Sequence, residues 1–274
     1  MDSIVLLGTG CPSPSHKRFG PSTLVKSGNQ NILIDAGSGV TQRLSKHGLK
    51  PAAIDIILIT HLHSDHIVDL YQLYISGWHS GRTKPFKIVG PRGIEKFFNK
   101  TMEAYDDELS LRIEWEKRPN NAGLEIEIIE INEEFTFDDQ DIKIKSIEVQ
   151  HQPVEPAYGY EFLVKNKKIT YSGDTKYSKN LENASKNAEY LIHEVFVDLN
   201  FDDKRMTQET LKNVKEYHST PEDVGKLAQA ANVKNLVLNH FVPPVFDEEV
   251  LRNEISKYYD GKIIVGSDLD VFNL

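Results

Sequence analysis

The chain has 274 residues, of which 39% are hydrophobic, 27% charged and 9% aromatic, and these fractions exclude a disordered or fibrous protein. The formal net charge of −9 disfavours a dedicated nucleic-acid binder, although a local basic patch can lie on an acidic protein. The single cysteine, Cys11, excludes an intramolecular disulfide and a zinc site built from several cysteines.

The first third of the chain predicts short strands separated by turn residues. These apolar stretches cover residues 3–7, 22–26, 31–35 and 55–60. The second and third are predicted to form a hairpin around Ser27-Gly28-Asn29, and the fourth is apolar on both faces, as a central strand is. Helices are predicted over residues 37–47 and, because apolar residues recur at helical spacing, from Asp65 onward.

The remainder mixes strands and helices. Strands are predicted at residues 86–89, 142–149, 158–164, 168–172, 234–238 and 262–265, and helices at 91–104, 220–231 and 247–258. The acidic run 125–141 predicts a half-buried antiparallel sheet with a solvated acidic face; it lacks the pattern of an EF-hand calcium loop. Residues 196–217 have a mixed pattern, and a lid, an interface or a surface loop with a helix all stay open. With no linker, we expect one α/β domain over residues 1–274.

Residues 60–66 carry the most informative pattern, Thr-His-Leu-His-Ser-Asp-His, between a predicted buried strand and a predicted helix. In an extended loop His61 and His63 point to the same side, because alternate residues do. Asp65 and His66, at the start of the helix, can turn toward the same point. Three imidazoles and a carboxylate suit Zn²⁺, and the lack of thiolates favours an open catalytic site over a structural one.

Three further ligand-type residues each follow a predicted strand: His151, Asp174 and His240. Active-site residues gather at such positions, just beyond the ends of strands. Together with the first cluster they make a set of candidate metal ligands: His61, His63, Asp65, His66, His151, Asp174 and His240. The set is too large for one zinc and suits two metals about 3.5–4 Å apart.

The segment 61–66 resembles the His-x-His-x-Asp-His signature of the metallo-β-lactamase superfamily, and the order of the later motifs also matches. Within it the chain is most similar to the ribonuclease Z and arylsulfatase-like branch. The supporting motifs are Gly8-Thr9-Gly10, Leu33-Ile34-Asp35-Ala36-Gly37, Gly90-Pro91-Arg92-Gly93, Ser172-Gly173-Asp174-Thr175, His193-Glu194 and His218-Ser219-Thr220. This resemblance covers nearly the whole chain and implies an αββα four-layer sandwich with two metals at the rim of the sheets.

The resemblance also implies how the ligands are shared. It assigns His61, His63 and His151 to the first metal, Asp65, His66 and His240 to the second, and Asp174 to a bridge between them. The cofactors would be two Zn²⁺, with Mn²⁺ as the alternative. They would share a hydroxide, formed from water whose pKa zinc lowers to about 7, that attacks phosphorus or sulfur in line. Asp65 would also hold the proton of the attacking water.

Outside the ligand set, His218 is the best candidate for a general acid, because the matching histidine of the branch faces the scissile group. The triplet His218-Ser219-Thr220 is also an ordinary helix N-cap, and both roles can hold, since a cap would fix the histidine. Asp35 and Glu194 are candidate carboxylates that orient the ligand imidazoles from behind. An ordinary turn residue for Asp35 and an exposed carboxylate for Glu194 stay open as alternatives.

Differences between this sequence and the family reduce the range of expected substrates. Ribonuclease Z enzymes that process tRNA carry a long arm between the residues matching His151 and Asp174, which here are only 23 positions apart. We therefore expect a hydrolase of small phosphodiesters, cyclic nucleotides among them, or of aryl sulfate esters. The alternative is a ribonuclease Z-type tRNA 3′-end endonuclease, and the second alternative is a non-catalytic metal-binding module.

The expected partner is a small anionic ester substrate, with nucleic acid not favoured. The resemblance alone suggests a homodimer. No apolar run approaches the ~20 residues of a membrane helix, and residues 1–8 lack the basic and long apolar regions of a secretory signal. We therefore expect no membrane partner and a cytoplasmic protein.

Overall fold

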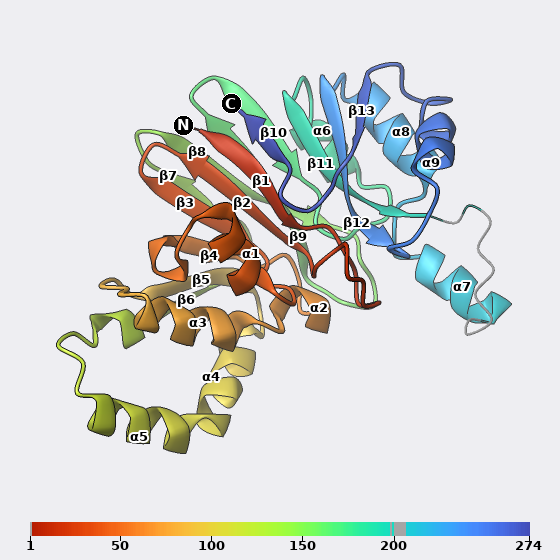
Figure 1. The fold of residues 1–274 in the computed structure, drawn as a ribbon. Coiled ribbons are helices and arrows are strands. Elements are labelled where there is room, and N and C mark those ends of the chain that lie inside the picture. Colours follow the sequence, from red (N-terminus) through yellow and green to blue (C-terminus); the bar gives the residue numbers. More distant parts are fainter. Residues whose placement is uncertain (1, 198, 200–206) are drawn as a thin grey trace.

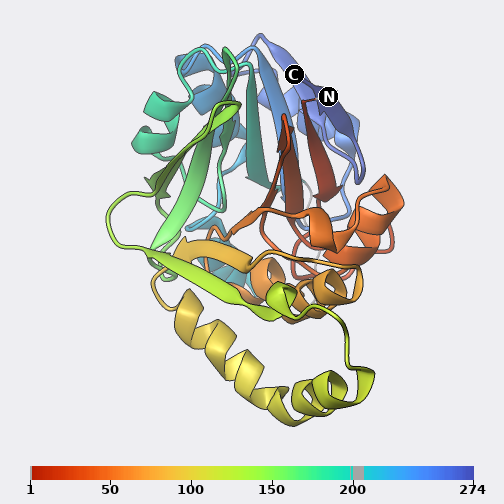
Figure 2. The same ribbon diagram turned by 90° about the vertical axis from the view of Figure 1, so that its left-hand side faces the viewer.

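The structure is a computed structural model that describes residues 2–197, 199 and 207–274. Two seven-stranded sheets pack against each other, and helices cover the outer face of each sheet (Figures 1 and 2). The expected αββα four-layer sandwich is confirmed. In the described part of the chain, no helix is long and apolar enough to cross a membrane.

The first sheet comes mostly from the N-terminal half of the chain. Its strand order is β14 (Val271–Asn273), β1 (Ser3–Gly8), β2 (Ser22–Ser27), β3 (Gln30–Ile34), β4 (Ile56–Leu58), β5 (Phe86–Pro91) and β6 (Ile126–Ile131). Its helices are α1 (Val40–His47), α2 (Ser64–Ile67), α3 (Leu70–His79), α4 (Ile94–Ala104) and α5 (Asp106–Glu116). Helices α4 and α5 extend away from the sheets (Figure 1).

The second sheet comes from the C-terminal half. Its strand order is β13 (Lys262–Val265), β12 (Asn235–Val242), β11 (Tyr190–Phe196), β10 (Lys167–Tyr171), β9 (Ala157–Val164), β8 (Ile142–Val149) and β7 (Thr136–Asp138). The helices of this half are α6 (Lys179–Ala184), α7 (Gln208–Lys215), α8 (Pro221–Ala230) and α9 (Glu248–Ile255). Short 3₁₀ turns lie at Pro51–Ala53 and Ala122–Leu124.

Side chains that alternate along each strand enter different hydrophobic cores and so join the layers of the sandwich. In β3, Ile32 and Ile34 enter the core between the two sheets, while Leu33 enters the core beneath the helices of the first sheet. Successive side chains of a strand point to opposite faces, so a strand that is apolar on both faces serves two cores at once. A third core lies between the second sheet and helices α8 and α9.

Three predicted elements differ in the structure. The acidic run 125–141 does not form one antiparallel sheet: β6 pairs parallel with β5 in the first sheet, and β7 pairs antiparallel with β8 in the second. Partial alternation of apolar and polar residues indicates a half-buried strand but does not indicate which strand it pairs with. The sequence therefore could not distinguish one sheet from two. The helix expected from Asp65 is divided into α2 and α3, and β12 continues through His240 to Val242.

The unassigned segment 196–217 contains the last residue of β11 and the helix α7. Residues 198 and 200–206, on which part of the lid or interface expectation falls, lie outside the described residues.

Candidate metal centre

The candidate ligands meet at one end of the two sheets. His61 and His63 lie on the loop after β4, and Asp65 and His66 belong to α2, which follows at once. The other three come from the second sheet: His151 follows β8, Asp174 follows β10, and His240 is in β12. Segments far apart in sequence converge because these strands end on the same side of the sandwich. The structure therefore brings all seven candidate ligands together, in two groups.

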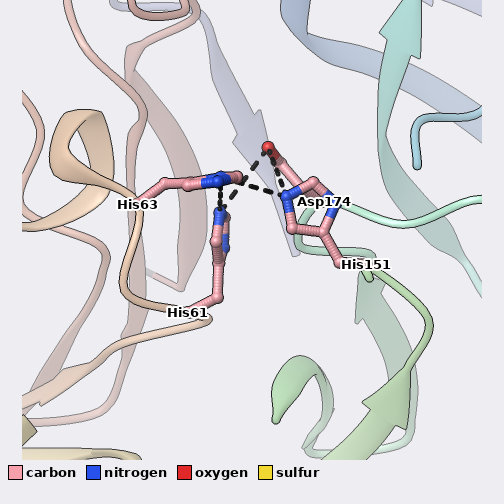
Figure 3. A group of neighbouring side chains, drawn as sticks. All are labelled: His61, His63, His151 and Asp174. Atoms are coloured by element: carbon pink, nitrogen blue, oxygen red, sulfur yellow. Dashed lines mark hydrogen bonds and ion pairs between the residues drawn. The ribbon is translucent and has the colours of Figure 1, made fainter. Parts of the chain in front are cut away.

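The first group contains His61, His63, His151 and Asp174, whose side chains point toward one another (Figure 3). Nδ1 of His63 lies 2.9 Å from Nε2 of His61 and 3.1 Å from Nε2 of His151. Two atoms that each lie about 2.1 Å from one tetrahedral zinc are themselves about 3.4 Å apart. The nitrogen separations are therefore close to those that one cation would impose.

The second group contains Asp65, His66 and His240. Nε2 of His66 lies 3.2 Å from Nε2 of His240 and 3.6 Å from Oδ2 of Asp65, which is 3.3 Å from Nε2 of His240. Asp174 lies between the groups, because its Oδ2 is 3.8 Å from Nε2 of His61 and 3.5 Å from Nε2 of both His66 and His240. That position suits a carboxylate shared by two cations.

The hydrogen bonds behind the imidazoles favour metal binding. His151 donates from Nδ1 to the carbonyl of Tyr217 at 2.8 Å, so its Nε2 carries a lone pair aimed at the first group. His66 Nδ1 lies 2.8 Å from Oδ2 of Asp35, which directs its Nε2 toward the second group. Burial lowers the pKa of His151 to about 4, so this imidazole is neutral at neutral pH. Imidazole nitrogens and carboxylate oxygens that converge on one point are the donors that zinc prefers, and the residues therefore fit divalent cations.

Asp35 lies next to the second ligand group, against His66. It is fully buried and, besides His66, accepts the backbone N–H of Thr60 at 2.8 Å. Its φ is 59°, and that of His240 is 41°, a left-handed region that residues other than glycine rarely adopt. Two residues of one site thus hold strained backbone, which occurs where the surrounding structure requires a particular side-chain direction.

Glu194 differs from the expectation. It is buried in β11, and in the described part of the chain its Oε1 binds His218 Nδ1 at 2.9 Å and two backbone amides, of Thr175 and Ser219, at 3.1 Å each. It therefore orients His218 and not a ligand imidazole, and it is not exposed. The sequence could not show this because the pairing depends on where residues 24 positions apart meet.

His218 lies beside both ligand groups. Its ring centroid is 5.2 Å from that of His151 and 6.0 Å from that of His240, and Phe196 stacks against it at 6.2 Å. Burial disfavours the imidazolium, but the charge of Glu194 and the hydrogen bond to it outweigh burial and raise the pKa of His218. The position and the proton affinity suit a general acid, and that role stays a prediction.

Sequence reasoning missed two residues of the site. Thr60 places its hydroxyl between Nδ1 of His61, at 3.0 Å, and the carboxylate of Asp35, at 2.9 Å. Tyr217 places its ring against His151, with centroids 5.1 Å apart. Thr60 directly precedes the ligand cluster in the sequence, and this position could have indicated its role. Tyr217 lies at the end of a segment whose pattern predicted no helix or strand, so no comparable indication existed.

Comparisons with known proteins show which family the chain belongs to. A family model described as "Anti-Pycsar protein Apyc1" matches residues 3–240. Ribonuclease Z from Mycobacterium marinum is 32% identical to this chain, over 98% of this chain and 97% of its own length.

Solved structures share the fold. YhfI from Bacillus subtilis, a metallo-β-lactamase fold protein, has a TM-score of 0.76 at 20% identity, covering 99% of this chain and 98% of its own. Human tRNase Z, short form, has a TM-score of 0.73 at 25% identity, with the same coverage. Zn²⁺-bound PqqB from Methylobacterium extorquens has a TM-score of 0.67 at 15% identity, covering 99% of this chain and 100% of its own. The chain therefore belongs to the family described as anti-Pycsar protein Apyc1 and, with its ribonuclease Z relatives, to the hydrolases of the metallo-β-lactamase fold.

Proposed function

We propose that the protein is a metal-dependent phosphodiesterase. The observation that carries this proposal is the position of the Glu194–His218 pair beside two groups of ligand atoms that share Asp174. Phosphodiester hydrolysis needs an activated water and a proton donor for the leaving oxygen; bound cations would supply the first and His218 the second. The relative named ribonuclease Z supports the same class of reaction. None of the relatives reported above supports the expected aryl sulfate ester, and we leave it out of the proposal.

The cofactor of this proposal is a pair of Zn²⁺ or Mn²⁺. His61, His63 and His151 would hold one cation, and Asp65, His66 and His240 the other, with Asp174 shared. When bound, such a pair acts as a Lewis acid toward the phosphate and lowers the pKa of its water.

The chain's own residues would move the protons. Glu194 accepts from Nδ1 of His218, so the other ring nitrogen, Nε2, would donate a proton to the leaving oxygen when the ring is an imidazolium. Since Glu194 raises the pKa of His218, a larger fraction of the ring is protonated at neutral pH. Asp65, at the start of α2, would accept the proton of the attacking water.

The first candidate substrate is the 3′ end of an RNA. It is favoured by relatives named ribonuclease Z that match nearly the whole chain, at 32–33% identity. Their likeness extends over both halves of the sandwich, so it includes every ligand-bearing segment.

The second candidate is a small phosphodiester, including a cyclic nucleotide. One observation favours it: between His151 and Asp174 the chain forms only a loop and the β9–β10 hairpin, whose strands pair directly from Tyr160–Tyr171 to Val164–Lys167. This connection leaves no arm with which to hold a folded tRNA.

One set of rates separates the candidates. The zinc- and manganese-loaded protein would be assayed side by side on a pre-tRNA, bis-p-nitrophenyl phosphate, cyclic AMP and p-nitrophenyl sulfate, with Asp174→Asn as the inactive control. Site-specific cleavage of the pre-tRNA with negligible turnover of the small esters would select the RNA. The reverse pattern would select the small phosphodiester, and no turnover of any phosphodiester would refute the proposed function.

A further inference from the structure

Tyr217 lies where the first ligand group meets the candidate general acid. Its ring centroid is 4.8 Å from that of His218, 5.1 Å from that of His151 and 6.4 Å from that of His63. The ring is half-buried, so it borders the site and remains accessible from solvent. A group that approached both a cation in the first group and His218 would pass close to this side chain.

The main chain holds this position. The carbonyl of Tyr217 accepts the hydrogen bond from Nδ1 of His151, at 2.8 Å, so the backbone at residue 217 is tied to the ligand group. The next residue is tied by its own hydrogen bond to Glu194. The side chain therefore starts from a backbone held at its own carbonyl and at the next residue, as a residue that contacts substrate requires.

The hydroxyl group of Tyr217 is available. Among the residues that the structure describes, it has no hydrogen-bond partner, in contrast to Tyr160, whose hydroxyl binds the carbonyl of Ile59 at 2.7 Å. A phenol is protonated at neutral pH, so this hydroxyl can donate a hydrogen bond. At the border of the ligand groups, it is therefore a donor without an acceptor among the described residues.

We infer that Tyr217 donates a hydrogen bond to a non-bridging oxygen of the phosphodiester, on the side of the site formed by His63 and His151. This inference rests on the proposed function and names a further substrate-binding residue for it. The phosphate oxygens would be acceptors for this donor, and they would lie beside the first cation. The hydrogen bond strengthens as negative charge grows on these oxygens in the transition state.

The test compares Tyr217→Phe with a matched variant, Tyr71→Phe. The first removes only the hydroxyl, so the ring contacts and the carbonyl bonded to His151 remain. The second removes a hydroxyl that binds Glu108 among the outer helices. With bis-p-nitrophenyl phosphate we expect kcat/KM to fall roughly 10- to 100-fold in Tyr217→Phe, the usual effect of losing a hydrogen bond to a charged group. Tyr71→Phe should match the wild type, and both should keep the wild-type metal content.

A second measurement does not depend on turnover. Isothermal titration calorimetry of the metal-loaded proteins with inorganic phosphate should give a Kd roughly tenfold weaker for Tyr217→Phe and unchanged for Tyr71→Phe. An unchanged phosphate Kd in Tyr217→Phe overturns the inference, as does a wild type that binds no phosphate. If the wild type binds phosphate but hydrolyses no phosphodiester, the proposed function fails while the calorimetry still decides the role of Tyr217. An effect in Tyr217→Ala that is absent in Tyr217→Phe would assign the role to the ring and also overturn it.

Discussion

At the scale of single residues, the site depends on imidazole rings that are oriented by hydrogen bonds on the side of the ring facing away from the site. Asp35 orients His66, the carbonyl of Tyr217 orients His151, and Glu194 orients His218. Each contact leaves the other ring nitrogen facing the site. The residue that binds the first ring nitrogen therefore helps to determine whether the imidazole serves as a ligand or as a proton donor. This separation of roles can be tested by changing one histidine at a time.

His218→Ala should lower kcat about 10²- to 10⁴-fold, the usual contribution of a general acid, and leave metal content unchanged. The reason is that His218 contacts the ligand groups without belonging to them. Phosphodiesterase rates and metal analysis of the same preparation check this prediction. A parallel loss of metal and activity would show that His218 is structural.

Glu194→Gln should move the alkaline limb of the kcat–pH profile to lower pH. The carboxylate raises the pKa of His218, so an amide in its place lets that pKa fall. A general acid works only while protonated, and activity would then be lost at a lower pH as pH rises. An alkaline limb that stays in place would exclude His218 as the titrating acid.

Gly173→Ala should reduce metal binding as well as stability. Gly173 has φ of 60°, and an added Cβ would lie 2.5 Å from the carbonyl oxygen of Tyr158, so the chain just before Asp174 must shift. Gly48→Ala is the matched control, because φ there is 85° but nothing lies within 4 Å of the added Cβ. Metal analysis should show a loss in the first variant only; equal metal content in both would contradict the placement of Asp174.

At the scale of elements, helix α8 connects the stability of the fold to the position of His218. Thr220 caps the helix: its hydroxyl accepts from the amide of Asp223 at 3.2 Å, and the Asp223 carboxylate accepts from the amide of Thr220 at 3.1 Å. The preceding residues are His218 and Ser219, so the capping box sets the direction in which the chain enters the site.

Thr220→Ala should lower the free energy of unfolding by about 1 kcal/mol, because the cap is lost from a helix that packs on the second sheet. Thr207→Ala is the control. It removes the equivalent cap of α7, whose residues are all at least partly exposed, so this helix should fray with little effect on global unfolding. Urea denaturation followed by circular dichroism measures both, and equal losses would contradict the difference in packing.

At the scale of the whole molecule, the candidate cations would join the two halves of the sandwich. The first-sheet half supplies His61, His63, Asp65 and His66, and the second-sheet half supplies His151, Asp174 and His240. Both ligand groups draw on both halves. Binding would therefore stabilise the packing of one sheet on the other as well as provide for catalysis.

Removing metal with a chelator should lower the melting temperature by several degrees. Ligand at 100 times its Kd stabilises a native protein by about 2.7 kcal/mol, and for a chain of this size each kcal/mol is worth about 2–4 °C. Scanning calorimetry with and without chelator measures the shift, and Asp174→Asn should show a smaller one. A melting temperature unaffected by chelator or added zinc would mean that the site holds no cation that links the halves.

Much of the molecule could be predicted from local pattern. Apolar runs such as residues 55–60, and glycine-containing turns such as Ser27-Gly28-Asn29, predicted strands. They did so because the burial of a strand follows from the pattern of apolar and polar residues next to one another in the chain. Helix α5 and strand β11 were not predicted; α5 contains a single buried residue, Leu109, so its apolar pattern is weak.

The sequence by itself determined which residue types stand at the strand ends, and with them the chemistry of the site, since imidazole and carboxylate donors can be recognised without knowing their positions. Only the tertiary structure decided their partners: Glu194 beside His218, Tyr217 beside His151, and β6 and β7 in different sheets. The physical reason is that periodicity reports the burial of each residue relative to its neighbours in the chain. Contacts between distant segments depend on how whole layers pack, and that packing is a property of the folded molecule.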